Sequence, residues 1–180
     1  MFCILITLFY REFQISDAFS LFPPFSFTQL LEINDWSIRG SVANLKSFLR
    51  LTSATDNNFG GVCHRIPTRF QDWTVELELL AKGGNGGEGF YFYFTKEFCP
   101  DNSDLFNGFA IFINTTTIYS SHYAHVSFNN TFNHSNSSIV GKIHIKNSSS
   151  TRFYITKTNN SIEMEYLSNG FRTKIFTANL

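Results

Sequence analysis

Two carboxylates, Glu76 and Glu78, are spaced so that both side chains lie on one face of a β-strand. Retaining and inverting glycosidases also act with two carboxylates, but theirs face one cleft that holds the sugar. Here apolar residues alternate with the two acids and occupy the opposite face of the same strand. We therefore expect Glu76 and Glu78 to lie on a solvated outer face and to take no part in catalysis.

A glycine-rich segment over residues 83–89 resembles a phosphate-binding loop in composition. A true loop of that kind continues with Lys and Ser or Thr and opens a helix, whereas a strand-forming run follows here. The sequence also lacks a Gly-x-Ser-x-Gly elbow and a His-Glu-x-x-His motif. It therefore predicts a binding or structural protein and not an enzyme.

The three cysteines are Cys3, Cys63 and Cys99. Cys63 and Cys99 could pair in an oxidising compartment, although we favour two unpaired thiols. None of the three has a partner at Cys-x-x-Cys or Cys/His spacing, so we expect no zinc site.

The elements that position these residues are predicted to be strands. Phenylalanine is unusually frequent, with 22 residues in a chain of 180, and aromatic residues suit pleated surfaces. Residues 73–79 are apolar at every second position, while residues 89–95 and 108–114 are apolar on both faces, as in central strands. Asn169-Gly170 is a two-residue hairpin signal. Further strands are expected over residues 35–41, 47–52, 142–146, 153–155, 162–166 and 171–177, with an extended or edge segment over 19–27. Many short strands without a helical period predict one all-β domain, a sandwich or barrel.

The first ten residues form an apolar run that is too short to cross a bilayer. With Ser16, Ala18 and Ser20 near a cleavage point, residues 1–20 are predicted to be a signal peptide and residues 21–180 the domain. The alternative is an N-terminal β-strand or buried anchor. No later apolar run is long enough for a membrane helix.

Asn-x-Ser/Thr triplets, the acceptors of N-glycans in secreted proteins, are dense in this chain. They also arise by chance in Asn/Ser/Thr-rich turns, so they support a secretory location only weakly. The triplets begin at Asn114, Asn129, Asn133, Asn136, Asn147 and Asn159. The formal net charge is zero, which argues against nucleic acid as a partner.

Several short elements occur in an order that resembles the legume-like (L-type) lectin domain of the early secretory pathway. This family comprises the intermediate-compartment mannose-lectin cargo receptors and the vesicular integral-membrane lectins. The resemblance covers residues 19–176 and is carried by Trp36-x-x-x-Gly40-Ser41, Trp73-Thr-Val-Glu-Leu, residues 86–95, Asn107-Gly-Phe-Ala-Ile-Phe-Ile and Asn169-Gly170. It implies a concanavalin-like β-sandwich, or jelly roll, of two antiparallel sheets.

The resemblance also implies a function without catalysis. Such lectins bind high-mannose N-glycans of glycoproteins, usually with calcium, and move this cargo between the endoplasmic reticulum and the Golgi. The expected location is the lumen of these compartments or outside the cell. Other lectin or coat-associated membrane proteins are expected as further partners.

The sugar site implied by the resemblance consists of Glu88, Asn114 and His134. Glu88 stands where the family has the aspartate of its Asp-Gly-(Leu/Phe)-Ala strand, so the carboxylate is kept on a longer side chain. Asn114 is expected to end the next strand, and His134 lies at the distance of the family's sugar-binding histidine. His122 and His125 are competing assignments, and His134 is equally well explained as an exposed loop histidine.

The family's calcium loop follows the strand that is expected to end at Asn114. The matching residues 115–118 contain no carboxylate, and calcium generally requires several. Asn114 and Asn136 are the remaining candidate metal ligands, so we expect calcium binding to be weak or absent. An aromatic platform for sugar falls to Tyr119 or Tyr123, although core packing explains either residue better.

We also expect no counterpart of the family's final glycine-rich loop, stalk or membrane span. These departures leave a second hypothesis open. On this hypothesis the chain is a structural or protein-interaction module on the lectin fold that has lost sugar and calcium binding.

Overall fold

The structure is a computed structural model, and every regular element in the part of the chain that it describes is a β-strand. The chain divides into two compact units, Met1–Gly83 with Lys146–Leu180 and Gly84–Ile145. No helix among the described residues is long and apolar enough to cross a membrane. The described residues are 2–9, 32–33, 35–45, 47–53, 58–68, 70–81, 89–99, 106–118, 121–128, 138–143, 145 and 150–180.

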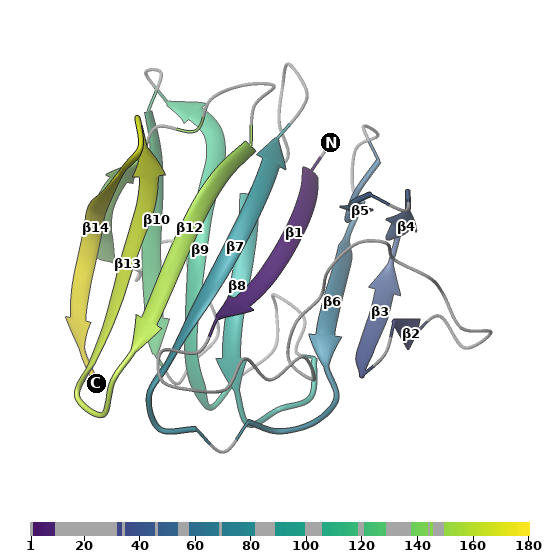
Figure 1. The fold of residues 1–180 in the computed structure, drawn as a ribbon, viewed down its shortest axis with the longest axis horizontal. Helices are drawn as coiled ribbons and strands as arrows, with labels where there is room; N and C mark the ends of the chain where they lie inside the picture. Colours follow the sequence, from purple (N-terminus) through teal and green to yellow (C-terminus); the bar gives the residue numbers. More distant parts are fainter. Residues whose placement is uncertain are drawn as a thin grey trace. The chain divides into compact units, whose positions relative to one another are not determined.

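The first unit contains a seven-stranded antiparallel sheet with the strand order β14-β13-β12-β7-β1-β5-β4 (Figure 1). β7 lies near its middle, paired with β1 on one side and with β12, from the end of the chain, on the other. The seven strands are β1 (Phe2–Phe9), β4 (Ala43–Asn44), β5 (Leu49–Arg50), β7 (Trp73–Ala81), β12 (Ser150–Lys157), β13 (Ser161–Ser168) and β14 (Phe171–Asn179).

A smaller antiparallel sheet in the same unit has the order β2-β3-β6. Its strands are β2 (Glu32–Ile33), β3 (Trp36–Gly40) and β6 (Gly60–His64). The predicted strands over residues 35–41 and 47–52 are therefore present, the second only as the short β5. The predicted segment over residues 19–27 lies outside the described residues.

The apolar core of the first unit follows the predicted period of two. In β7 the side chains of Trp73, Val75, Leu77 and Leu79 are all buried, as the alternation indicated. Their partners come from β12 and β13, where residues at every second position are also buried, and from β14, where Phe176 is the buried residue. Fully burying a Leu, Ile or Phe side chain contributes roughly 1.5–3 kcal/mol, so this face supplies the main drive for the sheet. The buried partners are Phe153, Ile155, Ile162, Met164, Tyr166 and Phe176.

The predicted hairpin turn at Asn169-Gly170 is confirmed. Both residues have positive φ, 52° for Asn169 and 83° for Gly170. A two-residue turn of this hand matches the twist of the strands that it joins, and Asn-Gly tolerates it at low cost. The turn connects β13 to β14, which pair from Ser168↔Phe171 outward.

The N-terminal segment predicted as a leader contains β1 in this structure. Phe2–Phe9 pairs with β7 over its whole length, and Cys3 and Ile4 also pair with β5. A signal peptide and a central β-strand both consist of a short run of apolar residues. The sequence of Phe2–Phe9 is therefore compatible with either. Cleavage of residues 1–20 stays a prediction.

The opposite face of this sheet carries charged residues, and here one expectation was wrong. Glu76 is not solvated but only 7% exposed. The carboxylate of Glu76 forms an ion pair with Arg152, whose Nε lies 3.1 Å from Glu76 Oε1. Nη2 of the same guanidinium group lies 3.2 Å from Glu78 Oε2. Burial raises the pKa of the Glu76 carboxyl, while Arg152 opposes the rise. Alternation alone placed this residue on the outer face but gave no information on what covers it.

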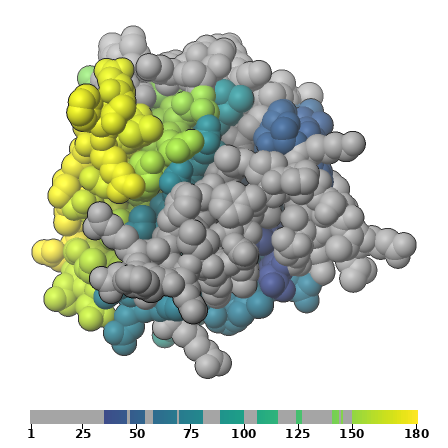
Figure 2. Space-filling view, in the orientation of Figure 1, coloured from purple at the N-terminus to yellow at the C-terminus, as the bar shows by residue number. Residues whose placement is uncertain are grey.

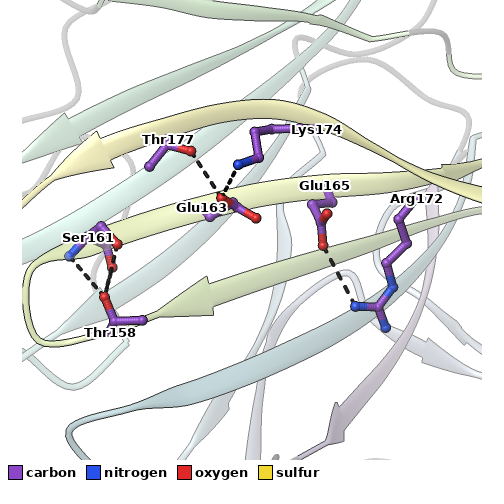
Figure 3. Close-up of polar contacts among 7 residues, drawn as sticks. All are labelled: Thr158, Ser161, Glu163, Glu165, Arg172, Lys174 and Thr177. Carbon is purple, nitrogen blue, oxygen red and sulfur yellow. Dashed lines mark hydrogen bonds and ion pairs between the residues drawn. The ribbon is translucent and has the colours of Figure 1, made fainter.

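The same charged face continues across the last hairpin (Figure 3). Glu163 of β13 contacts Lys174 and accepts a hydrogen bond from Thr177, both on β14. Hydrogen bonding to Glu163 raises the pKa of the Lys174 ammonium group. Residues of β13 and β14, coloured towards yellow, form an exposed part of the surface in Figure 2.

The guanidinium of Arg172 lies 3.7 Å above the centre of the Tyr154 ring and 3.7 Å from the carboxylate of Glu165. We name the set Glu76, Glu78, Arg152, Tyr154, Glu163, Glu165, Arg172 and Lys174 the charge-paired face. Each of its cations faces at least one of its carboxylates.

The second unit is a four-stranded antiparallel sheet with the order β11-β10-β9-β8. Its strands are β8 (Gly89–Thr95), β9 (Gly108–Ile118), β10 (Ser121–Phe128) and β11 (Ser138–Ile143). The predicted strands over residues 89–95 and 108–114 are confirmed, but β9 does not end at Asn114. It runs on to Ile118, where Ser121 of β10 pairs with it, because Thr115–Ile118 is rich in β-branched residues that favour strand. The strand predicted over residues 142–146 corresponds to the end of β11, which begins earlier, at Ser138, and ends at Ile143.

Both Cys63 and Cys99 are disulfide-bonded, which corrects the expectation of two unpaired thiols. Spacing along the chain does not reveal such a bond, because a disulfide requires proximity of the two Cα atoms in space and not in sequence.

Candidate functional site

Asn114 lies in the middle of the second unit's sheet, held between two neighbouring strands. It pairs with Gly89 of β8 on one side and with Tyr123 of β10 on the other. Residues directly opposite each other in an antiparallel ladder share a face, and so does every second residue of a strand. The residues that share the face of Asn114 therefore include Gly89, Tyr91, Phe112 and His125, and we name this set the Asn114 face.

Aromatic rings form the floor of the Asn114 face. The ring of Tyr91 stacks on Phe112 with centroids 4.4 Å apart and an interplanar angle of 28°. On the other side of Phe112, the imidazole of His125 lies 5.9 Å away, tilted by 41°. Phe112 is buried, whereas Tyr91 and His125 are half-buried and so keep part of their surface exposed to solvent.

Gly89 is required where β8 meets this floor. Its φ is +153°, and a Cβ atom there would lie 2.3 Å from the carbonyl oxygen of Ile113 and 2.5 Å from Cε2 of Phe112. No side chain fits into that space without moving the backbone or the ring. The absence of a side chain lets the Phe112 ring lie directly beside the Gly89–Asn114 pair.

The reverse face of the same sheet is apolar. Phe109, Ile111 and Ile113 of β9 are buried there, together with Ala124 and Val126 of β10. Among the described residues of this unit, the charged side chains are Lys96, Glu97 and Lys142, and all three are exposed.

Of the predicted sugar-binding residues, Asn114 is the one that the structure describes. It is half-buried and lies on the same face as His125, one of the two competing histidine assignments. Glu88, His134 and Asn136 lie outside the described residues, as does Tyr119. His122 and Tyr123 are described only by their places in β10, where Tyr123 pairs with Asn114.

Tyr91 is the residue of this face that sequence reasoning missed. It occupies the alanine position of the Asp-Gly-(Leu/Phe)-Ala pattern, two residues after Gly89 in the same strand. The alternation of β8 indicated that Tyr91 shares a face with Gly89. Only the register of β8 against β9 shows that this is also the face of Asn114, and register is not encoded in either strand alone.

The residues that follow Asn114 do not fit calcium. Calcium binds six to eight oxygen ligands at a site, typically with several carboxylates. The sequence contains neither Asp nor Glu from residue 105 to residue 162, so no carboxylate lies in this stretch of chain. No group of three or more His, Cys, Asp or Glu side chains that suits a metal is found within the described part of the chain either.

All described strand pairings in both units are antiparallel, and comparison with known proteins identifies the fold. The legume-like lectin family matches residues 12–179. The chain therefore belongs to the legume-like lectin family. No curated protein sequence matches it significantly.

Solved lectin domains share this fold at low sequence identity. The exoplasmic/lumenal domain of VIP36 in its Ca²⁺/Man3GlcNAc-bound form is 17% identical, with a TM-score of 0.72 over 91% of this chain and 76% of that chain. Its metal-free form is 16% identical, with a TM-score of 0.70 over 92% and 79%. The legume lectin-like domain from Entamoeba histolytica is 14% identical, with a TM-score of 0.67 over 89% and 84%. The predicted fold class, a concanavalin-like β-sandwich of two antiparallel sheets, is confirmed, although the described strands form three separate antiparallel sheets.

Proposed function

We propose that this chain is a carbohydrate-binding domain that takes high-mannose N-glycans of glycoproteins on the Asn114 face, without catalysis. The observation that carries the proposal is the combination of Asn114, His125 and Tyr91 on one face of one sheet. Membership of the legume-like lectin family supports it. VIP36, which shares the fold, has been crystallised with Man3GlcNAc and with Man2.

The chemistry of this face suits a neutral polyol. The amide of Asn114 both donates and accepts hydrogen bonds, and the imidazole of His125 adds two ring nitrogens that can form hydrogen bonds. The exposed part of the Tyr91 ring offers an apolar surface to the C–H side of a pyranose and a phenolic hydroxyl to its oxygens. Glu88, which directly precedes Gly89 in the sequence, and His134 are proposed as further sugar-binding residues on the family resemblance.

We further propose that this binding does not require calcium. The backbone of Asn114 is already fixed by ladder pairing to β8 and β10. The residues that follow it lack the carboxylates that would hold the ion, as described above. VIP36 has been crystallised in Ca²⁺-bound forms, so the calcium dependence of sugar binding should be measured directly.

The proposed location is the lumen of the endoplasmic reticulum or Golgi, with a role in glycoprotein transport between them. Disulfide-bonded cysteines favour an oxidising compartment. The VIP36 domain that shares this fold is an exoplasmic/lumenal domain, which supports the same location. Other lectin or coat-associated membrane proteins are proposed partners. N-terminal sequencing of the protein from the secretory pathway tests the leader: a start near residue 21 supports it, and a start at Met1 contradicts it.

A glycan array probed with the full chain, with calcium and with a chelator, tests the function. We expect mannose-terminated glycans to bind equally under both conditions. Asn114→Ala should weaken binding at least about tenfold, which corresponds to roughly 1.4 kcal/mol. Asn160→Ala, an exposed asparagine in the first unit, is the matched control and should bind like the wild type. If no glycan binds at high protein concentration, the chain is instead a structural or interaction module on the lectin fold.

A further inference from the structure

Six Asn-x-Ser/Thr triplets occur in this chain, and the structure describes two of their asparagines. Asn159 is exposed and lies between β12 and β13, outside any strand. Asn114 is half-buried inside β9 and paired on both sides. The two acceptor motifs are alike in sequence and differ entirely in the room that they leave for a bulky substituent.

The turn that carries Asn159 is well braced. Thr158 N–H donates to the carbonyl of Ser161 at 2.8 Å. The hydroxyls of the two residues lie 2.9 Å apart, as Figure 3 shows. The N–H of Ser161 also donates to Thr158 Oγ1 at 3.2 Å. These contacts fix the turn through Thr158 and Ser161 and leave the Asn159 side chain exposed, as a glycan-bearing turn requires.

We propose that Asn159 is an N-glycosylation site of the folded protein and that Asn114 stays unmodified. The inference rests on the lumenal location in the proposed function, because the modifying machinery acts there. A glycan on Asn114 would have to leave a face floored by Tyr91 and Phe112, and it would occupy the proposed sugar site. A glycan on Asn159 projects from the turn and disturbs no packed side chain.

The reaction joins the Asn159 side chain to an oligosaccharide carried on a lipid pyrophosphate. The amide nitrogen Nδ2 forms a bond to the anomeric carbon of the first sugar. The bond from that carbon to the pyrophosphate oxygen breaks, and the lipid pyrophosphate leaves with the electron pair. Nδ2 loses one proton to a base, so the product is a neutral N-linked amide.

Peptide mass spectrometry of the full chain from a eukaryotic secretory host tests the proposal. The chain is expressed both with its own N-terminus and behind an added cleavable leader that forces entry into the lumen. Enzymatic deglycosylation in heavy-oxygen water should mark Asn159, and Asn159→Gln should abolish the mark. Asn160→Gln, which keeps the Asn-x-Ser motif, is the matched control and should keep the glycan.

Two further variants separate the motif from the fold of the turn. Ser161→Ala removes the acceptor hydroxyl and the contact with Thr158, and it should abolish the glycan. Thr158→Ala breaks the same contact but leaves the motif, and it should keep the glycan. An unmodified Asn159 in protein secreted behind the added leader would overturn the proposal, as would a glycan on Asn114. Failure of the chain to reach the lumen on its own N-terminus, with Asn159 modified behind the added leader, contradicts the proposed location and supports the site.

Discussion

The charge-paired face of the first unit and the Asn114 face of the second unit use polar side chains in different ways. On the charge-paired face, each cation meets a carboxylate from a neighbouring strand, as Arg152 meets Glu76 and Glu78. On the Asn114 face, an amide, an imidazole and a phenol lie over aromatic rings without a formal charge in the set. The first arrangement pairs its charges within the sheet, while the second is the face on which we propose that a neutral sugar binds.

The largest difference in stability between the two units should come from replacing one glycine in each, Gly89 and Gly170. Gly89→Ala places a Cβ against the Ile113 carbonyl and the Phe112 ring, and we expect it to lower the free energy of unfolding by about 3 kcal/mol. Gly170→Ala is the matched control, because Gly170 also has positive φ but nothing lies within 4 Å of the added carbon. That variant should lose only about 1 kcal/mol, the cost of backbone strain. Urea denaturation measures both, and equal losses would contradict the account of the Gly89 contact.

A smaller loss of stability is expected from replacing Arg152, which forms ion pairs with both Glu76 and Glu78. Arg152→Ala leaves the buried Glu76 without its ion pair, which should cost about 2 kcal/mol of unfolding free energy. Arg172→Ala removes a cation that is more exposed and lies farther from its acid, and it should cost no more than about 1 kcal/mol. The double variant Arg152→Ala with Glu76→Gln should recover part of the loss. No recovery would show that Arg152 acts through packing and not through charge.

The pH dependence of stability should show the weakest but most specific effect. Burial raises the pKa of Glu76 above its ordinary value of 4.5, with Arg152 opposing. As the pH falls through the raised value towards 4.5, the folded protein therefore takes up this proton before the unfolded chain does. The contribution of Glu76 to stability is unfavourable above that window and is relieved within it.

Urea denaturation of the wild type and of Glu76→Gln across this pH range isolates the effect. Subtracting the stability of Glu76→Gln from that of the wild type should give a difference that rises as the pH falls. A difference that stays flat or falls would contradict a raised pKa in the folded state.

Several of the strands were predictable because they carry their own signal, whereas the short β2 and β4 were not predicted and β1 was predicted to be a leader. Alternation identified β7, and Asn169-Gly170 identified the last turn, since both patterns are local. The end of β9 was missed because Asn114 was assigned by resemblance as the last residue of the strand, with a loop after it. The threonines that follow it have their own strand preference, and pairing with β10 extends it.

The composition of the candidate site was only partly predictable, for the opposite reason. Asn114 was identified from the order of short elements, but the partners on its face depend on register between strands. Tyr91 and His125 come from different strands, and no pattern within either strand reports their shared neighbour Phe112. The burial of Glu76 was missed likewise, because its partner Arg152 lies on a strand far away in the sequence.

Nuclear magnetic resonance during a titration with an α-linked mannose disaccharide tests the central claim most directly. With a chelator present, the account predicts shifts at Gly89, Tyr91, Asn114 and His125, and none at Glu163, Arg172 or Lys174. Tyr91→Leu should weaken binding at least about tenfold, roughly 1.4 kcal/mol, because it keeps an apolar side chain but removes the ring and its hydroxyl. Shifts confined to the charge-paired face, or no shifts at saturating sugar, would contradict the assignment of the Asn114 face as the binding site.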